Sequence, residues 1–130
     1  HLAVAPAAIG ANCGTGAAEL IATVLGITEA RPDAVVVAKG NCGIPQYHDG
    51  HIHYSGTPEL MADYARIAFD SGARIIGGCC GTSPDHLAAM RQALEAHTKG
   101  ARPEIADVEA RLGTVSDLAK GKGPVAAVRE

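Results

Sequence analysis

Three short apolar runs in this chain each end close to a cysteine, and each is followed by a pattern typical of an amphipathic helix. The cysteines are Cys13, Cys42, Cys79 and Cys80, so the spacings are 29 and 37 to 38 residues. Each spacing fits one strand–helix unit, the second lengthened by a loop. Parallel strands joined by right-handed crossovers place their carboxyl ends at one edge of a sheet. We therefore expect Cys13, Cys79 and Cys80 to be neighbours in space.

The apolar runs predict buried parallel strands. The strands are expected over residues 7–11, 34–38 and 73–76. The helices are expected from Ala17 to before Arg31, from Thr57-Pro58-Glu59 to Gly72, and from Ser83-Pro84-Asp85 to before Gly100. The last two starts combine a hydroxyl cap with a proline at the first helical position. Residues 39–56 are expected to form a long polar loop.

The predicted fold class is α/β, with three β-α units. Three units alone would leave two sheet edges open, and a closed eight-unit barrel needs about 250 residues. We therefore expect the C-terminal three β-α units of a TIM (β/α)8 barrel, cut from a longer protein, since the chain begins at His1. Residues 1–100 would be the C-terminal part of the barrel domain. Residues 101–130 would form a short helix, with Ile105, Val108 and Leu112 on one side, and a flexible tail.

Charge and composition narrow the class of protein. The formal net charge is -3 and there is no long basic run, so no nucleic-acid partner is expected. No apolar stretch approaches the roughly 20 residues of a membrane span, so no membrane association is expected. The chain is neither very short nor loop-rich, so four cysteines favour metal binding in a reducing cytoplasm over disulfides.

Thiolates gathered at strand ends favour zinc above most other biological metals. The flanking glycines of Gly77-Gly78-Cys79-Cys80-Gly81 suit a backbone held close to an ion. Structural zinc has four protein ligands, whereas catalytic zinc keeps one position open. On cysteine counting alone, a catalytic zinc, a structural zinc and a vicinal redox pair all remain open.

Three segments carry a family resemblance: Gly10-Ala11-Asn12-Cys13, Lys39-Gly40-Asn41-Cys42-Gly43-Ile44-Pro45 and Gly72-Ala73-Arg74-Ile75-Ile76-Gly77-Gly78-Cys79-Cys80-Gly81-Thr82. In order and spacing, over about residues 7–98, they resemble the zinc-dependent homocysteine S-methyltransferase family, and most closely its bacterial betaine-using branch. The resemblance implies a TIM barrel whose Zn²⁺ is held by Cys13, Cys79 and Cys80. It also implies that Asn41 lies near the metal and can approach it when homocysteine is absent. Cys42 stands where the family commonly has a small residue, and it is not assigned to the metal.

The resemblance further implies transfer of a methyl group to the thiol of homocysteine, forming methionine. Homocysteine would supply the fourth sulfur, and zinc would hold its thiol as a thiolate. Betaine is the favoured donor. S-Methylmethionine, a cobalamin-linked donor, and a non-catalytic zinc-binding or thiol-redox module are the alternatives. The fragment alone is expected to be inactive, and to form a homo-oligomer or associate with the missing N-terminal part.

Other polar residues allow two interpretations. Asn12 and Asn41 are either turn residues or substrate-binding residues beside the strand ends. His48, His51 and His53 are expected to be solvated, with a second metal site as the alternative. His86 is expected to be a surface residue.

Overall fold

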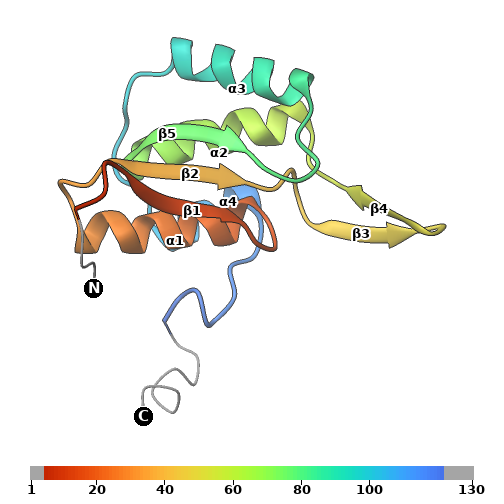
Figure 1. Cartoon of the computed structure of the whole chain (residues 1–130), viewed down its shortest axis with the longest axis horizontal. Helices are drawn as coiled ribbons and strands as arrows, with labels where there is room; N and C mark the ends of the chain where they lie inside the picture. Colours follow the sequence, from red (N-terminus) through yellow and green to blue (C-terminus); the bar gives the residue numbers. More distant parts are fainter. Residues whose placement is uncertain (1–4, 122–130) are drawn as a thin grey trace.

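A computed structural model describes residues 5–121 of the chain. Its centre is a parallel sheet of β1 (Ile9–Cys13), β2 (Val36–Gly40) and β5 (Ala73–Gly78), in the order β1-β2-β5 (Figure 1). The helices α1 (Ala17–Ala30), α2 (Pro58–Asp70) and α3 (Pro84–Ala96) follow at the strands' carboxyl ends, and α4 (Ile105–Leu112) comes last. The predicted α/β class and parallel strands are confirmed.

The sheet extends further toward the cysteines than the apolar runs suggested. β1 was expected to end at Ala11 and β2 at Ala38, but pairing continues through Asn12 opposite Lys39 and Cys13 opposite Gly40. Backbone hydrogen bonds hold a strand whatever its side chains are, so polar residues can complete it. As a result, Cys13 is the last residue of a strand and not part of a loose turn.

The segment predicted as a long loop contains an antiparallel hairpin, so that prediction was wrong in part. β3 (Pro45–His48) pairs with β4 (His51–Tyr54), and Figure 1 shows the hairpin projecting beyond the sheet. The two connecting residues, Asp49 and Gly50, have φ of 50° and 80°. Asp-Gly with positive φ at both positions is the favoured two-residue hairpin turn, and this signal could have been found in the sequence.

One face of the parallel sheet is covered by helices and the other is open. On the covered side, Val36 and Ala38 of β2 are fully buried, with α1 packed on β1 and β2 and α2 packed on β5. On the open side lie the alternate residues of all three strands, including Val37, Lys39 and Ile75, and Ile75 is 52% exposed. The described residues therefore form a half-covered layer, not a sheet enclosed on both faces.

The predicted helix starts are confirmed. The Thr57 hydroxyl accepts a hydrogen bond from the Leu60 N–H at 3.0 Å, and Ser83 caps α3. On α3, Leu87 is 48% exposed while Met90 is buried. The reason is that α3 packs mainly on α2 and touches the sheet little, so its buried face is narrow.

The C-terminal segment packs on the outer side of the helical layer. Val108 of α4 is fully buried between α1 and α2. Arg102 donates hydrogen bonds to the carbonyl oxygens of Leu25 and Ser71 at 2.6 and 3.1 Å. Most of the predicted flexible tail lies outside the described residues. Within residues 5–121, no helix has the length and apolarity needed to cross a membrane.

Candidate metal centre

Three cysteine side chains meet where the parallel strands end. Cys13 pairs with Gly40 of β2, and Gly40 pairs in turn with Gly78 of β5. Cys79 and Cys80 follow Gly78 directly, so the register brings all three cysteines to the same edge although 66 residues separate Cys13 from Cys79. Cys13 itself has φ of 67°, a left-handed backbone conformation that is uncommon for residues other than glycine.

The spacing of the three sulfur atoms fits a single soft metal ion. Cys80 Sγ lies 3.9 Å from Cys13 Sγ and 4.0 Å from Cys79 Sγ, and all three sulfurs lie within 4.8 Å of one another. Tetrahedral zinc with Zn–S bonds of about 2.3 Å requires sulfur separations of roughly 3.8 Å. The thiols could therefore hold one ion with little movement. Among the described residues, this is the one group of metal-ligating side chains so closely gathered.

Asn41 fixes the geometry of the cysteine segments from inside the protein. Its side chain is 2% exposed. Nδ2 donates to the Gly14 carbonyl oxygen at 2.6 Å, and Oδ1 accepts from the Cys80 N–H at 3.1 Å. One amide thus ties the turn that follows Cys13, the last residue of β1, to the turn after β5 that contains Cys80.

Backbone hydrogen bonds and one tyrosine hold the ends of β2 and β5 together. The Cys79 N–H donates to the Gly40 carbonyl oxygen at 2.8 Å, and the Cys42 N–H to that of Cys80 at 2.9 Å. From α2, the fully buried Tyr64 hydroxyl accepts from the Gly40 N–H at 2.9 Å and donates to the Gly77 carbonyl oxygen at 3.2 Å. The backbone beside the thiols is therefore preorganised on rigid elements.

The thiols influence one another as expected for a cluster that attracts a cation. The Gly14 backbone N–H, followed by the Cys80 thiol, lowers the pKa of Cys13. The Cys13 sulfur in turn raises the pKa of Cys80, because it accepts the Cys80 proton. The Cys13 thiol therefore loses its proton more easily than a free cysteine, and the Cys80 thiol less easily. A divalent cation would relieve this conflict by favouring all three thiolates.

Cys42 lies apart from the cluster, in the core. It is 1% exposed, burial raises the pKa of its thiol, and its Sγ donates to the Gly56 carbonyl oxygen at 3.0 Å. His86 also reaches that oxygen, with Nε2 at 3.0 Å. His86 Nδ1 accepts from the Ser83 N–H, which makes Nε2 the donor. The expectation that His86 is only a surface residue was wrong, since it caps α3 and holds Gly56.

The remaining candidate site residues from the sequence are exposed and are not part of the cysteine cluster. Asn12 is exposed on the open face of β1, opposite Lys39. His48, His51 and His53 share one face of the hairpin and are exposed, with the rings of His48 and His53 6.0 Å apart. Over residues 5–121, these histidines do not gather closely enough to form a ligand group.

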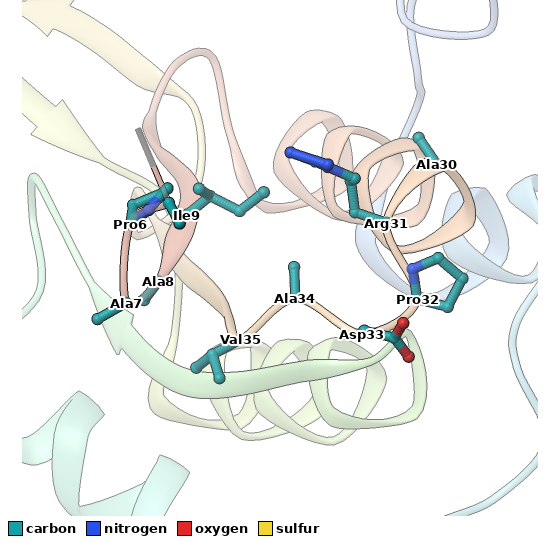
Figure 2. A pocket seen from close by; sticks show the side chains of 11 residues that line it. Pro6, Ala7, Ala8, Ile9, Ala30, Arg31, Pro32, Asp33, Ala34 and Val35 are labelled. Atoms are coloured by element: carbon teal, nitrogen blue, oxygen red, sulfur yellow. The ribbon is translucent and has the colours of Figure 1, made fainter. Parts of the chain in front are cut away.

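A cavity of about 660 Å³ lies at the opposite end of the sheet (Figure 2). Its lining is mainly small and apolar, with Ala8, Ile9 and Val35 at the start of the strands and Arg31 and Asp33 after α1. Active sites of parallel α/β folds lie at the carboxyl ends of strands, and this cavity is at the amino ends. It has no part in the candidate metal centre.

A comparison with known protein families matches most of the chain. The sequence model described as homocysteine S-methyltransferase matches residues 1–94. The matched region contains the whole parallel sheet, the hairpin and all three clustered cysteines.

Proposed function

Because the chain belongs to the homocysteine S-methyltransferase family, we propose that Cys13, Cys79 and Cys80 bind one Zn²⁺ that activates homocysteine for methylation. The observation that carries this proposal is the convergence of the three sulfurs within 4.8 Å at the strand ends. Among the described residues the cluster offers three protein ligands, one fewer than a structural zinc site has, which supports a site open to substrate.

The bound ion would hold the homocysteine thiol as a thiolate near neutral pH. The chain's own residues supply the geometry. Cys13, Cys79 and Cys80 bring their sulfurs within 4.8 Å of one another, and the Asn41 amide fixes the turn after Cys13 and the turn that contains Cys80. Because these groups are already in place, little ordering remains when substrate arrives.

The overall reaction is a displacement at a methyl carbon. A bond forms between the homocysteine sulfur and the methyl carbon, and the bond from that carbon to the donor heteroatom breaks with its electron pair. The products are methionine and the demethylated donor, and the thiol proton passes to solvent. Alignment of sulfur, carbon and leaving group contributes much of the rate in such a reaction.

Betaine is the proposed donor, on the likeness of residues 39–54 to the betaine-using branch. S-Methylmethionine and a cobalamin-linked methyl group are the alternatives. The three β-α units are proposed to be the last three of a closed eight-unit barrel. Within residues 5–121, one sheet face is open and the outer edges of β1 and β5 pair with no further strand, which supports this proposal. The remaining strands would complete the donor site, in a cytoplasmic enzyme.

X-ray absorption at the zinc edge tests the proposed role of the metal. Selenohomocysteine should place one selenium in the first coordination shell, in exchange for a nitrogen or oxygen neighbour. Proton release should accompany binding, because a largely protonated thiol becomes a thiolate. Stoichiometric zinc with an unchanged environment under saturating homocysteine would show a structural zinc instead. Absence of zinc would favour a thiol-redox module.

A further inference from the structure

Lys39 places a positive charge on the open face of the sheet, close to the edge where the cysteines meet. It is exposed, and it pairs in register with Asn12 of β1 and with Gly77 of β5. The next row of the sheet begins with Cys13 and leads directly into Cys79. Successive residues of a strand are about 3.3 Å apart. Lys39 therefore lies one residue before the row in which the strands deliver their cysteines.

The stem of Lys39 lies beside Gly77, on the side of β5. A Cβ added at Gly77 would stand 3.8 Å from Lys39 Cγ, an ordinary van der Waals contact. Because Gly77 has no side chain, the space beside this stem is free. A lysine has a flexible four-carbon stem and a compact ammonium group with three donors. Lys39 can therefore turn its ammonium group toward the end of β5, which leads into Cys79 and Cys80.

The open face gives Lys39 no acidic partner among the described residues. The ion pairs within residues 5–121 all join other side chains. The row of Lys39 holds the neutral residues Asn12 and Gly77, and the preceding row includes Val37 and Ile75. A single positive charge thus stands on an otherwise uncharged part of the sheet.

An anion in this place would complete the surroundings of Lys39. In the proposed closed barrel the open face would turn inward, and an unpaired charge removed from water is costly. Homocysteine carries a carboxylate on a short carbon chain from the sulfur that the metal would hold. That chain keeps the carboxylate near the cysteine edge, and Lys39 is the cation that the strand register places beside this edge.

We propose that Lys39 binds the carboxylate of homocysteine while the substrate sulfur occupies the metal centre. This inference rests on the proposed function, because the metal-bound sulfur sets where the carboxylate can reach. Two points of attachment fix the direction of the substrate chain, and with it the direction in which the sulfur faces the methyl donor. The charge-assisted hydrogen bond also selects against thiols that lack a carboxylate.

Lys39→Met tests the proposal, because methionine keeps an unbranched side chain and removes the ammonium group. Binding is measured in the cobalt-substituted 130-residue chain, where a thiol that enters the metal shell changes the thiolate-to-cobalt charge-transfer band. The two ligands are homocysteine and aminopropanethiol, which is homocysteine without its carboxylate. We expect Lys39→Met to bind homocysteine about 10- to 100-fold more weakly, as for the loss of a hydrogen bond to a charged group. Its affinity for aminopropanethiol should equal that of the parent, which also shows that its metal centre is intact.

Arg74→Met is the matched control, since Arg74 is an exposed cation near the amino end of β5, away from the cysteines. It should leave both affinities unchanged. Betaine is the other source of a carboxylate, and calorimetric titration of betaine into the parent and Lys39→Met separates the two. Betaine binding that depends on Lys39, with unchanged homocysteine affinity in Lys39→Met, would assign the lysine to the donor and overturn the inference.

The remaining outcomes separate this inference from the proposed function. If Lys39→Met binds both thiols as the parent does, or loses affinity for both equally, Lys39 does not recognise the carboxylate and the inference is overturned. The proposed function then stands, because the parent still takes the homocysteine sulfur into the metal shell. If homocysteine leaves the cobalt spectrum of the parent unchanged, the proposed function and the inference fail together.

Discussion

The Asn41 side chain accepts a hydrogen bond from the backbone N–H of Cys80 at 3.1 Å, across 39 residues of sequence. The same amide donates to the Gly14 carbonyl oxygen. A buried amide that satisfies two backbone groups on different turns holds those turns at a fixed separation. At this separation, the sulfurs of Cys13 and Cys80 lie 3.9 Å apart.

Asn41→Ala should therefore weaken metal binding without touching a metal ligand. It leaves the Cys80 N–H and the Gly14 carbonyl oxygen unpaired, and we expect zinc affinity to fall by about 10-fold or more. Chelator competition measures the effect. Asn12→Ala is the control, because Asn12 is exposed on the open face of β1. An equal loss of zinc affinity in both variants would contradict the proposal that the Asn41 amide holds the cysteine segments in place.

Replacement of Cys13, Cys79 or Cys80 by Ala should remove most of the bound zinc and nearly all methyl transfer. The expected loss of affinity exceeds about 100-fold, the upper range for outer partners. Cys42→Ala is the matched control, since its sulfur bonds Gly56 in the core and not the other thiols. Metal analysis of the purified variants decides the matter. Full zinc content in Cys80→Ala would refute the ligand set.

Tyr64 should make stability depend on pH in the alkaline range. Burial raises the pKa of Tyr64, whereas the same group titrates near about 10 in the unfolded chain. The unfolded state therefore loses its proton first as the pH rises. Tyr64 should stabilise the fold fully below about pH 10, and stability should fall by about 1.4 kcal/mol per pH unit above it.

Tyr64→Phe separates this effect from other alkaline titrations. The variant should lose this part of the slope above about pH 10. At neutral pH it should also lose about 1–3 kcal/mol, because the Gly40 N–H is left buried without its partner. Urea unfolding at a series of pH values gives both quantities. Parallel pH profiles for the two proteins would show that Tyr64 does not stay protonated as described.

Arg102 should be the main attachment of the C-terminal segment to the helical layer. Its guanidinium donates to the Leu25 and Ser71 carbonyl oxygens and to Thr28 Oγ1. Arg102→Ala should cost about 1.5–3 kcal/mol in the free energy of unfolding, the range for hydrogen bonds to charged groups. Arg91→Ala is the control, because the exposed Arg91–Glu95 pair contributes at most about 0.5 kcal/mol. Similar losses in the two variants would contradict this attachment.

The open sheet face should cause the chain to associate. Exposed strand edges and apolar side chains template pairing with other strands, so the 130-residue chain should form dimers or larger species. Ile75→Lys should shift this equilibrium toward monomer, whereas Leu87→Lys on α3 should not, although both residues are about half exposed. Sedimentation velocity measures the distribution. A parent chain that stays monomeric at high concentration would contradict the proposed barrel fragment.

Local signals in the sequence determined the helices and the parallel units. Proline after a hydroxyl residue starts α2 and α3, and the continuous apolar run before Lys39 forms most of β2. The same reasoning selected Cys13, Cys79 and Cys80 as neighbours, because parallel strands put their carboxyl ends together. The strand register explains this proximity, since Cys13 pairs with Gly40 and Gly40 pairs with Gly78, the residue before Cys79.

Tertiary structure alone decided what surrounds the sulfurs. Nothing in the residue order shows that Asn41 bridges Gly14 and Cys80, that His86 holds Gly56, or that Tyr54 is seated on Gly81. These contacts join segments 27 to 39 residues apart, and each depends on the angle at which a helix or hairpin leaves the sheet. Periodicity and capping report only on neighbours along the chain. The packing of distant elements fixes such angles, and with them the second layer of the candidate metal centre.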